Sequence, residues 1–252
     1  METIFIAFLF SFIAGISTGL GGLIAFLVKE FKYTQLSIFM GFSVGVMVYI
    51  SFVELLFTAV RDIGLIYANV AFFLGIIIIA TLDFLIPHEY KDEHIPKGEK
   101  ERRKIARTGL LISIGIAIHN FPEGFVAFFG TIKDVHLGFL LLLAVALHNI
   151  PEGISVSVPI YYATKDRKKA FKWSFLSGIA EPVGAIIGFL ILYPFLSSFL
   201  VNMVLASTAG MMIFISFDEL LPFSLKYGEE HNVIVSLFLG MALMLLTLIL
   251  IR

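Results

Sequence analysis

The chain has 252 residues, and its hydrophobic content of 59% is too high for a soluble globular domain. The formal net charge of −1 says little by itself, because the positions of the charges carry the information. Cysteine is absent, which excludes disulfides and thiolate metal ligands. We therefore expect an all-α membrane protein that crosses the bilayer several times.

Eight apolar runs are long enough to cross a bilayer, which takes about 20 residues of helix. The first begins at Ile4 and lacks the basic segment and cleavage site of a signal peptide, so we expect it to remain as a span. The eight predicted spans cover residues 4–28, 36–60, 64–86, 108–132, 136–160, 174–193, 199–223 and 232–251. Together they predict a single transmembrane domain over residues 1–252.

Lysine and arginine are concentrated on one side of these spans. Fifteen of the 18 basic residues fall in alternate loops, chiefly in the linkers 87–107 and 164–172, and three fall on the opposite side. Loops rich in lysine and arginine stay in the cytoplasm. We therefore expect the charged linker 87–107, between the third and fourth spans, to be cytoplasmic and both termini to be extracellular.

Two phrases recur along the chain. Residues 50–56 of the second span read ISFVELL, and residues 215–221 of the seventh read ISFDELL. A weaker echo relates the first span to the sixth, with Gly15, Thr18 and Gly21 corresponding to Gly178, Glu181 and Gly184. The second and seventh spans cross in opposite directions, so we predict an inverted pseudo-repeat of three helices on each side of a central pair, a 3+2+3 arrangement.

The central pair carries one hexapeptide in the middle of each apolar run, HNFPEG at residues 119–124 and HNIPEG at residues 148–153. Histidine, asparagine and glutamate of each motif share one helix face, because they are three or four residues apart. Ionisable groups at this depth cost a few kcal/mol and usually persist where they serve an ion or proton. Each proline also leaves a carbonyl, that of Ile118 or Leu147, without its N–H partner.

Because the two central spans are antiparallel, the motifs meet at one depth and predict a metal centre near mid-membrane. Each motif glutamate could bridge an ion on its histidine side and another on its asparagine side. Imidazole, amide and carboxylate ligands suit Zn²⁺ and also Fe²⁺, Mn²⁺ or Co²⁺, whereas Mg²⁺ and Ca²⁺ prefer oxygen alone. The candidate ligands, with one from the sixth span, are His119, Asn120, Glu123, His148, Asn149, Glu152 and Glu181.

Further acidic groups could form a path on either side of this centre. Glu54 lies toward the outer end of its predicted span, and Asp218 and Glu219 lie toward the inner end of theirs. Asp83 and His88 lie at the cytoplasmic end of the third span, where an exit role competes with simple solvation.

The doubled HNxPEG motif, followed by Glu-Pro in the next helix, resembles the ZIP (Zrt/Irt-like) metal-ion transporters, in particular their prokaryotic ZupT-like branch. The resemblance covers the whole chain. It implies uptake of Zn²⁺, and also Fe²⁺, Mn²⁺, Co²⁺ or Cd²⁺, across the cell membrane into the cytoplasm. The ion is then a substrate and not a cofactor, and the expected partners are divalent ions and lipid. No nucleic acid is expected, and the chain could form a homodimer.

The resemblance also implies a binuclear centre with two ligand sets. By position, the first site would use His119, Glu123, His148 and Glu152. The second site would use Asn120, Glu123, Asn149, Glu152 and Glu181.

Two other functions compete with transport. An intramembrane zinc-dependent metalloenzyme needs an open coordination position and a dedicated base, and its hydrolase activity would disappear in Glu123→Ala. The duplicated HxxxE spacing differs from HExxH and favours holding ions over activating water. A proton channel would carry protons without any divalent metal and would not need the paired asparagines.

Overall fold

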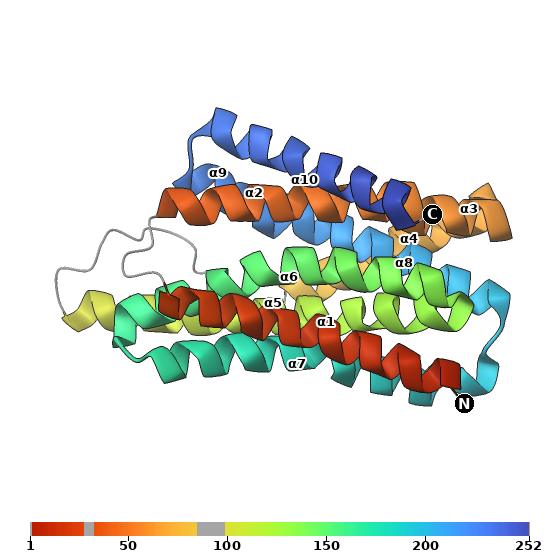
Figure 1. Ribbon diagram of the computed structural model, residues 1–252, viewed down its shortest axis with the longest axis horizontal. Helices are drawn as coiled ribbons and strands as arrows, with labels where there is room; N and C mark the ends of the chain where they lie inside the picture. Colours follow the sequence, from red (N-terminus) through yellow and green to blue (C-terminus); the bar gives the residue numbers. More distant parts are fainter. Residues whose placement is uncertain (1, 28–32, 85–98, 252) are drawn as a thin grey trace.

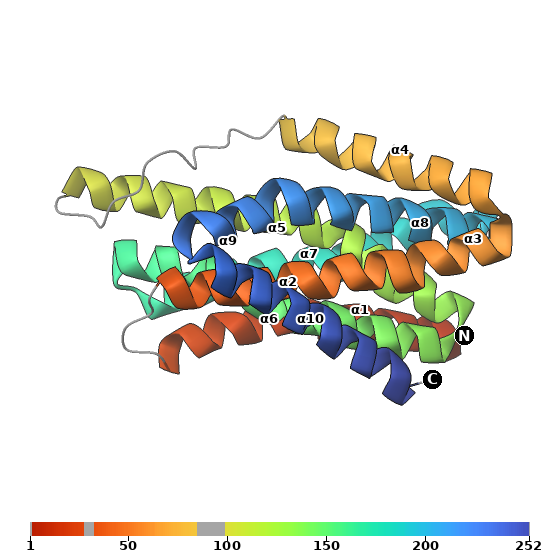
Figure 2. The same cartoon turned by 90° about the horizontal axis from the view of Figure 1, so that it is seen from above.

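The computed structural model describes residues 2–27, 33–84 and 99–251, and over these ranges it is helical throughout, without strands. Figures 1 and 2 show the helices running side by side along the long axis. Six rods are single helices: α1 (Glu2–Leu27), α4 (Leu65–Phe84), α5 (Glu99–Lys133), α6 (Val135–Thr164), α7 (Arg167–Leu192) and α10 (Glu230–Ile251).

Two further rods each consist of three consecutive helical segments. The first is α2 (Tyr33–Ile50), η1 (Ser51–Leu56) and α3 (Phe57–Ile63). The second is α8 (Ser198–Ile215), η3 (Ser216–Leu220) and α9 (Leu221–Tyr227), and a short turn, η2 (Tyr193–Phe195), precedes it. The segments η1 and η3 are π-helical. They coincide with the two copies of the ISFxELL phrase, so the repeated sequence adopts the same uncommon backbone form twice.

The rods have the length and composition of membrane helices. Within the residues that the structure describes, seven helical stretches are long and apolar enough to cross a membrane. The helix α5 is 35 residues long and contains the expected span 108–132. The outer faces of α4 and α10 are apolar, with Ile66 and Leu250 each 75% exposed, which suits lipid and would be unfavourable in water. The all-helical, polytopic membrane class expected from the sequence is confirmed.

Two helices begin earlier than hydropathy indicates. The helix α5 starts at Glu99, inside the expected linker 87–107, and α7 starts at Arg167, inside the expected linker 164–172. Asp166 caps α7, because its carboxylate accepts a hydrogen bond from the backbone N–H of Lys169 at 3.1 Å. The length of an apolar run matches the thickness of the bilayer core. The helix itself can begin earlier, at the residue that caps its first turn.

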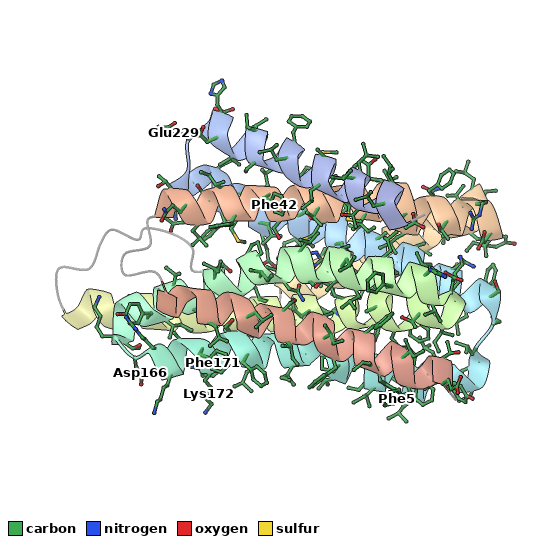
Figure 3. The ribbon with its side chains drawn as sticks, viewed as in Figure 1. Phe5, Phe42, Asp166, Phe171, Lys172 and Glu229 are labelled. Atoms are coloured by element: carbon green, nitrogen blue, oxygen red, sulfur yellow. The ribbon has the colours of Figure 1, made fainter. Side chains whose placement is uncertain are left out.

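Both ends of the chain lie at the same end of the bundle, which we call the terminal end (Figure 1). The opposite end carries Asp166, Lys172 and Glu229 (Figure 3) and is called the basic end. A chain that crosses an even number of times returns to the side on which it started, as this arrangement requires.

The helices pack as two groups. In the first group, α1, α5, α6 and α7 each contact the other three. In the second group, α2 packs on α10 and α4 on α8, while η1 contacts α8 and η3 contacts α2. The groups meet chiefly where α2 and α10 contact α6 and where α5 contacts α8. One polar bond at this junction joins the Ser43 hydroxyl to the carbonyl of His148 at 3.2 Å.

Aromatic side chains close the first group toward the terminal end. The rings of Phe8, Phe128 and Phe189 come from α1, α5 and α7, and their centroids lie 4.7 to 5.6 Å apart. Such tilted and edge-on pairs add about 0.5–1.5 kcal/mol each beyond burial of their area. This aromatic cluster holds the three helices around the polar motifs deeper in the group.

Backbone contacts at glycine hold the second group together in a repeated pattern. At four glycines an added Cβ would overlap a backbone oxygen of the neighbouring helix: Gly45 on Leu237, Gly240 on Phe42, Gly75 on Ser207 and Gly210 on Phe72. Positions 42, 45, 72 and 75 correspond to 207, 210, 237 and 240, a constant offset of 165 residues. The pair α2 and α10 therefore packs as the pair α8 and α4 does.

A lysine joins the two groups at the terminal end. Lys133, the last residue of α5, donates to the Asp62 carboxylate at 2.6 Å and to the Asn202 side-chain oxygen at 2.5 Å. Asp62 belongs to α3 and Asn202 to α8, so this contact crosses from the first group to the second. Arg61 also binds Asp62, at 2.9 Å, but stays within α3.

Candidate metal centre

Both hexapeptides lie inside continuous helices, 119–124 in α5 and 148–153 in α6. Neither Pro122 nor Pro151 interrupts its helix. Since proline lacks an N–H, each leaves one carbonyl without an intrahelical partner while the side chains keep their helical spacing. The histidine, asparagine and glutamate positions of each motif thus lie on neighbouring parts of one face of an intact helix.

The centre begins with three side chains that converge from α5 and α6. His148 Nε2 lies 3.1 Å from Glu123 Oε1, and both residues are buried. One donor atom from each of Glu123, His148 and Glu152 lies within 4.8 Å of the other two. Zinc binds nitrogen and oxygen ligands at about 2.0–2.2 Å, so three atoms this close can share one ion. The side chain of His119, a further expected ligand, lies outside the described residues.

Asn120, the second residue of the first motif, has its amide nitrogen bound on the side of α1 and α7. It donates to the carbonyl of Ser177 at 3.2 Å and to the hydroxyl of Thr18 at 3.5 Å. Asn120 is fully buried, and in the described part of the chain its amide oxygen has no hydrogen-bond partner. A buried amide oxygen of this kind is suited to a cation.

Asn149, in the second motif, is held in the same way. Its amide nitrogen donates to the carbonyl of Ala14 at 3.0 Å and to the carboxylate of Glu181. Its amide oxygen is likewise buried and has no hydrogen-bond partner among the described residues. Glu181 comes from α7 and is itself fully buried. The structure therefore brings Glu181 to the asparagine side of the second motif.

Glycines allow α1 and α7 to approach the motifs this closely. A Cβ on Gly153 would overlap the backbone oxygen of Thr18, and a Cβ on Gly124 would overlap that of Glu181. Gly124 and Gly153 are the last residues of the two hexapeptides. Any larger residue there would push away the helix that positions the asparagines, so the final glycine of each motif is a packing requirement of the centre.

Thr18 is the residue of this centre that was not among the expected ligands. The sequence contained one indication of it, the echo that set Thr18 against Glu181. The structure gives the echo a meaning, because each of the two residues binds the amide nitrogen of one motif asparagine. The echo alone was insufficient, since short similarities among apolar helices occur by chance.

The described acidic residues expected along a path lie in three helical segments, η1, η3 and α4. Glu54 is buried in η1, where its carboxylate lies 3.3 Å from the Thr58 hydroxyl. Asp218 and Glu219 lie in η3, and Asp83 is buried in the last turn of α4. Residue His88 lies outside the described residues. Glu54 and Glu219 occupy the same place in the two π segments, on opposite halves of the bundle.

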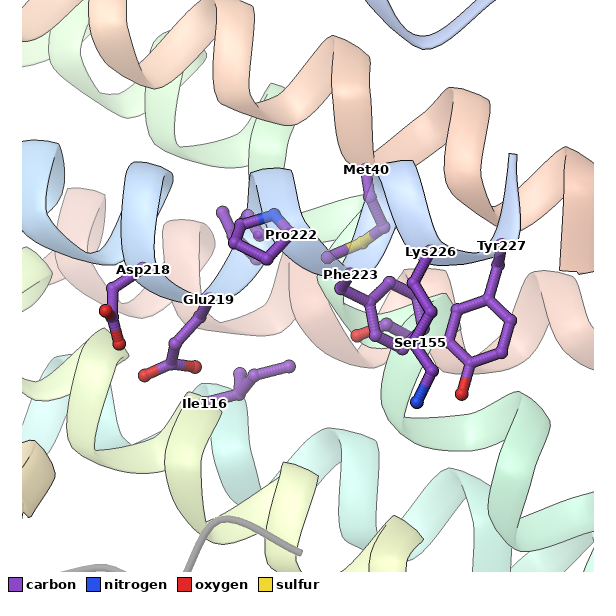
Figure 4. A pocket seen from close by; sticks show the side chains of 10 residues that line it. Met40, Ile116, Ser155, Asp218, Glu219, Pro222, Phe223, Lys226 and Tyr227 are labelled. Atoms are coloured by element: carbon purple, nitrogen blue, oxygen red, sulfur yellow. The ribbon is translucent and has the colours of Figure 1, made fainter. Parts of the chain in front are cut away.

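Asp218 and Glu219 line a cavity of about 270 Å³ on the basic-end side of the centre. Figure 4 shows the Glu219 carboxylate beside Ile116 of α5, while Lys226 and Tyr227 lie further along the cavity. Ser155 also lines it and follows Glu152 by three residues on α6. The cavity thus reaches within one helical turn of the metal-centre residues.

Comparison with known proteins gives a consistent result. The family model of the ZIP zinc transporters matches residues 84–248. A Streptococcus mutans protein named zinc transporter ZupT is 45% identical over 99% of this chain and 98% of its own length. Proteins of the same name from Oceanobacillus iheyensis and Chlorobium phaeovibrioides are 47% and 48% identical, each over 99% of both chains.

Proposed function

This chain belongs to the ZIP zinc transporter family, and from that premise we propose that it carries Zn²⁺ across the cell membrane into the cytoplasm. Other divalent transition metals, Fe²⁺, Mn²⁺, Co²⁺ and Cd²⁺, are candidate substrates of the same site. The observation that carries the proposal is the buried cluster of Glu123, His148 and Glu152. These residues come from two antiparallel helices, and a captured cation accounts for their presence at this depth.

The proposed centre holds two ions. The first site uses His119, Glu123, His148 and Glu152, and the second uses Asn120, Glu123, Asn149, Glu152 and Glu181. The short distances among Glu123, His148 and Glu152 support the first. The contact of Asn149 with Glu181, together with the unpartnered amide oxygens within the described ranges, supports the second. Shared and protonatable ligands release an ion more readily than a closed structural zinc site does.

The proposed topology is an inverted repeat of 3+2+3 helices, with both termini outside and the linker 87–107 inside. The glycine contacts that recur at an offset of 165 residues support the repeat, as do the paired segments η1 and η3. The distribution of lysine and arginine supports the orientation. In this orientation the terminal end is extracellular and the basic end is cytoplasmic, and residues 1–252 form one transmembrane domain.

The proposed path runs from Glu54 on the outer half, through the centre, to Glu219 and Asp218 on the inner half. Asp83 and His88 would lie at its exit. Burial of Glu54 and the cavity beside Glu219 support these two positions.

Membership of a transporter family argues against the alternative function, an intramembrane metalloenzyme. A homodimer belongs to the same proposal, and light scattering of the purified protein would test it.

Uptake into proteoliposomes tests the central claim. Purified protein should admit Zn²⁺, with Fe²⁺, Mn²⁺ and Cd²⁺ tested as competitors and the pH varied on each side. We expect His148→Ala to abolish zinc uptake, because it removes an imidazole from the buried cluster. His136→Ala is the matched control, since His136 is an exposed histidine near the start of the same helix. Normal uptake by His148→Ala would overturn the proposal.

A further inference from the structure

The two asparagine cradles of the centre differ at one position. In each cradle one neighbouring helix supplies a backbone carbonyl and the other supplies a side-chain oxygen. Along each of these two helices, the residue that supplies the side-chain oxygen lies four positions after the residue that supplies the carbonyl. Helix α7 supplies Ser177 O and α1 supplies Thr18 Oγ1 to Asn120. Helix α1 supplies Ala14 O and α7 supplies Glu181 Oε1 to Asn149. Thr18 therefore has the place in one cradle that Glu181 has in the other.

We propose that Thr18 determines metal specificity at this centre: its hydroxyl orients Asn120 without adding a carboxylate, and so it makes the two ion positions unequal. This inference rests on the proposed function and adds to it. Thr18 is fully buried on α1 and holds its position through its backbone, because its carbonyl accepts a hydrogen bond from Ser174 at 2.8 Å.

Orientation of the amide is the first effect. Asn120 offers one donor group and one acceptor atom, and a cation can use only the acceptor. The Thr18 hydroxyl and the Ser177 carbonyl both take the donor, so the oxygen is turned away from them. Without the hydroxyl, a buried donor loses one of two partners and the amide can rotate, which costs metal affinity.

Charge is the second effect. The site already holds three buried carboxyl groups, those of Glu123, Glu152 and Glu181. A fourth carboxylate at position 18 would make the cradles alike and richer in oxygen. Oxygen-rich sites favour Mn²⁺ relative to Zn²⁺, and a more anionic site holds a cation longer than conduction permits. Threonine avoids both consequences.

Space limits what position 18 can accept. A Cβ added to Gly178 would come within 2.9 Å of the Thr18 Cβ, so the two helices are in close contact there. Serine, valine and aspartate are close to threonine in size and suit the test. Thr18→Ser keeps the hydroxyl, Thr18→Val keeps the shape without it, and Thr18→Asp adds a charge.

The experiment measures Zn²⁺ and Mn²⁺ binding to the purified chain by calorimetry, and uptake of both ions into proteoliposomes. We expect Thr18→Val to weaken zinc binding roughly tenfold, because it removes a buried hydrogen bond. Thr18→Ser should stay within about threefold of the parent. Thr18→Asp should shift the preference toward Mn²⁺ by roughly tenfold and lower kcat together with KM.

Thr131→Val is the matched control. Thr131 is fully buried, and its hydroxyl donates only to the Ala127 carbonyl of its own helix in the described contacts, at 2.6 Å. Thr131→Val should bind zinc as the parent does. Thermal unfolding is measured without metal for every variant, and metal binding is compared only among variants that unfold as the parent does. Parent-like affinity and preference in Thr18→Val and Thr18→Asp would overturn the inference. So would equal losses in Thr18→Ser and Thr18→Val. A parent chain that binds no metal would instead overturn the proposed function.

Discussion

The two helix groups bury different chemistry behind similar backbone packing. In the first group, α1, α5, α6 and α7 bury a histidine, two asparagines and three glutamates, and the histidine and two of the glutamates lie close enough to share one ion. In the second group, glycines bring helices equally close, and the carboxylates lie in the π segments, Glu54 in η1 and Asp218 with Glu219 in η3. One group therefore supplies the proposed metal centre, and the other supplies carboxylates to the proposed path on either side of it.

The difference shows how close packing and polar function are combined in a membrane. Helices in lipid associate through small residues, because apolar side chains gain little by leaving the hydrocarbon. The second group uses glycine for association alone. The first uses Gly124 and Gly153 for association and also to bring backbone carbonyls within reach of the asparagines. A glycine substitution in the first group should therefore lower both zinc affinity and stability. One in the second group should lower stability alone.

The largest expected effect is loss of the shared carboxylate of the first group. Glu152→Ala should reduce zinc accumulation in cells to the level of cells without the protein, because this buried glutamate belongs to both proposed sites. Uptake of radioactive zinc measures the effect, and surface labelling shows that the variant reaches the membrane. Glu230→Ala, in the exposed first turn of α10, is the control and should accumulate zinc normally. Normal accumulation in Glu152→Ala would remove the centre from the mechanism.

Glycine substitutions compare the groups directly. Gly153→Ala and Gly240→Ala each place a Cβ against a neighbouring backbone oxygen, so each should cost about 1–3 kcal/mol of stability. Thermal unfolding in detergent measures the cost. Only Gly153→Ala should also weaken zinc binding, because it moves α1 away from the motifs.

Gly115→Ala is the control for these two variants, since the nearest atom to an added Cβ there lies 3.8 Å away. It should unfold like the parent. Equal zinc affinity in Gly153→Ala and Gly240→Ala would show that the two groups do not differ in the way proposed.

The two carboxylates at equivalent positions of the π segments, Glu54 and Glu219, should affect zinc uptake less than the residues of the centre do. Glu54→Gln and Glu219→Gln should each lower zinc uptake roughly tenfold without abolishing it, because a carboxylate outside the centre concentrates cations locally but does not form the site. Initial uptake rates at low and high ionic strength measure this. Zinc affinity in detergent should be unchanged in both. A variant with no uptake at all would place that glutamate among the metal ligands.

The smallest expected effect lies where the groups meet at the terminal end. Lys133→Met should lower stability by about 1–2 kcal/mol, because it removes charge-assisted hydrogen bonds to Asp62 and Asn202. Arg61→Gln removes a cation from the same Asp62, but the Arg61 side chain is 63% exposed, and the cost should be below about 0.5 kcal/mol. Unfolding midpoints of the two variants give the comparison. Equal midpoints would mean that Lys133 does not join the groups.

Much of the centre could be predicted from the sequence, for identifiable reasons. The spacing within HNxPEG is a helical property, and two copies in successive antiparallel spans must meet at one depth. These two facts predicted that Glu123, His148 and Glu152 would be neighbours, and the structure places them together. The contact of Lys133 with Asn202 could not be predicted, because neither residue lies in a motif and their helices meet only in the folded protein.

The sequence by itself determined the helical membrane class, the number of apolar runs and the face of each central helix that carries polar groups. These properties follow from hydropathy and from a period of 3.6 residues, which operate within a single helix. Tertiary structure alone decided that Thr18 and Glu181 would hold the two asparagines, since α1 and α7 reach the motifs only where glycine lets backbones touch. Close packing between helices depends on shapes that no single helix contains.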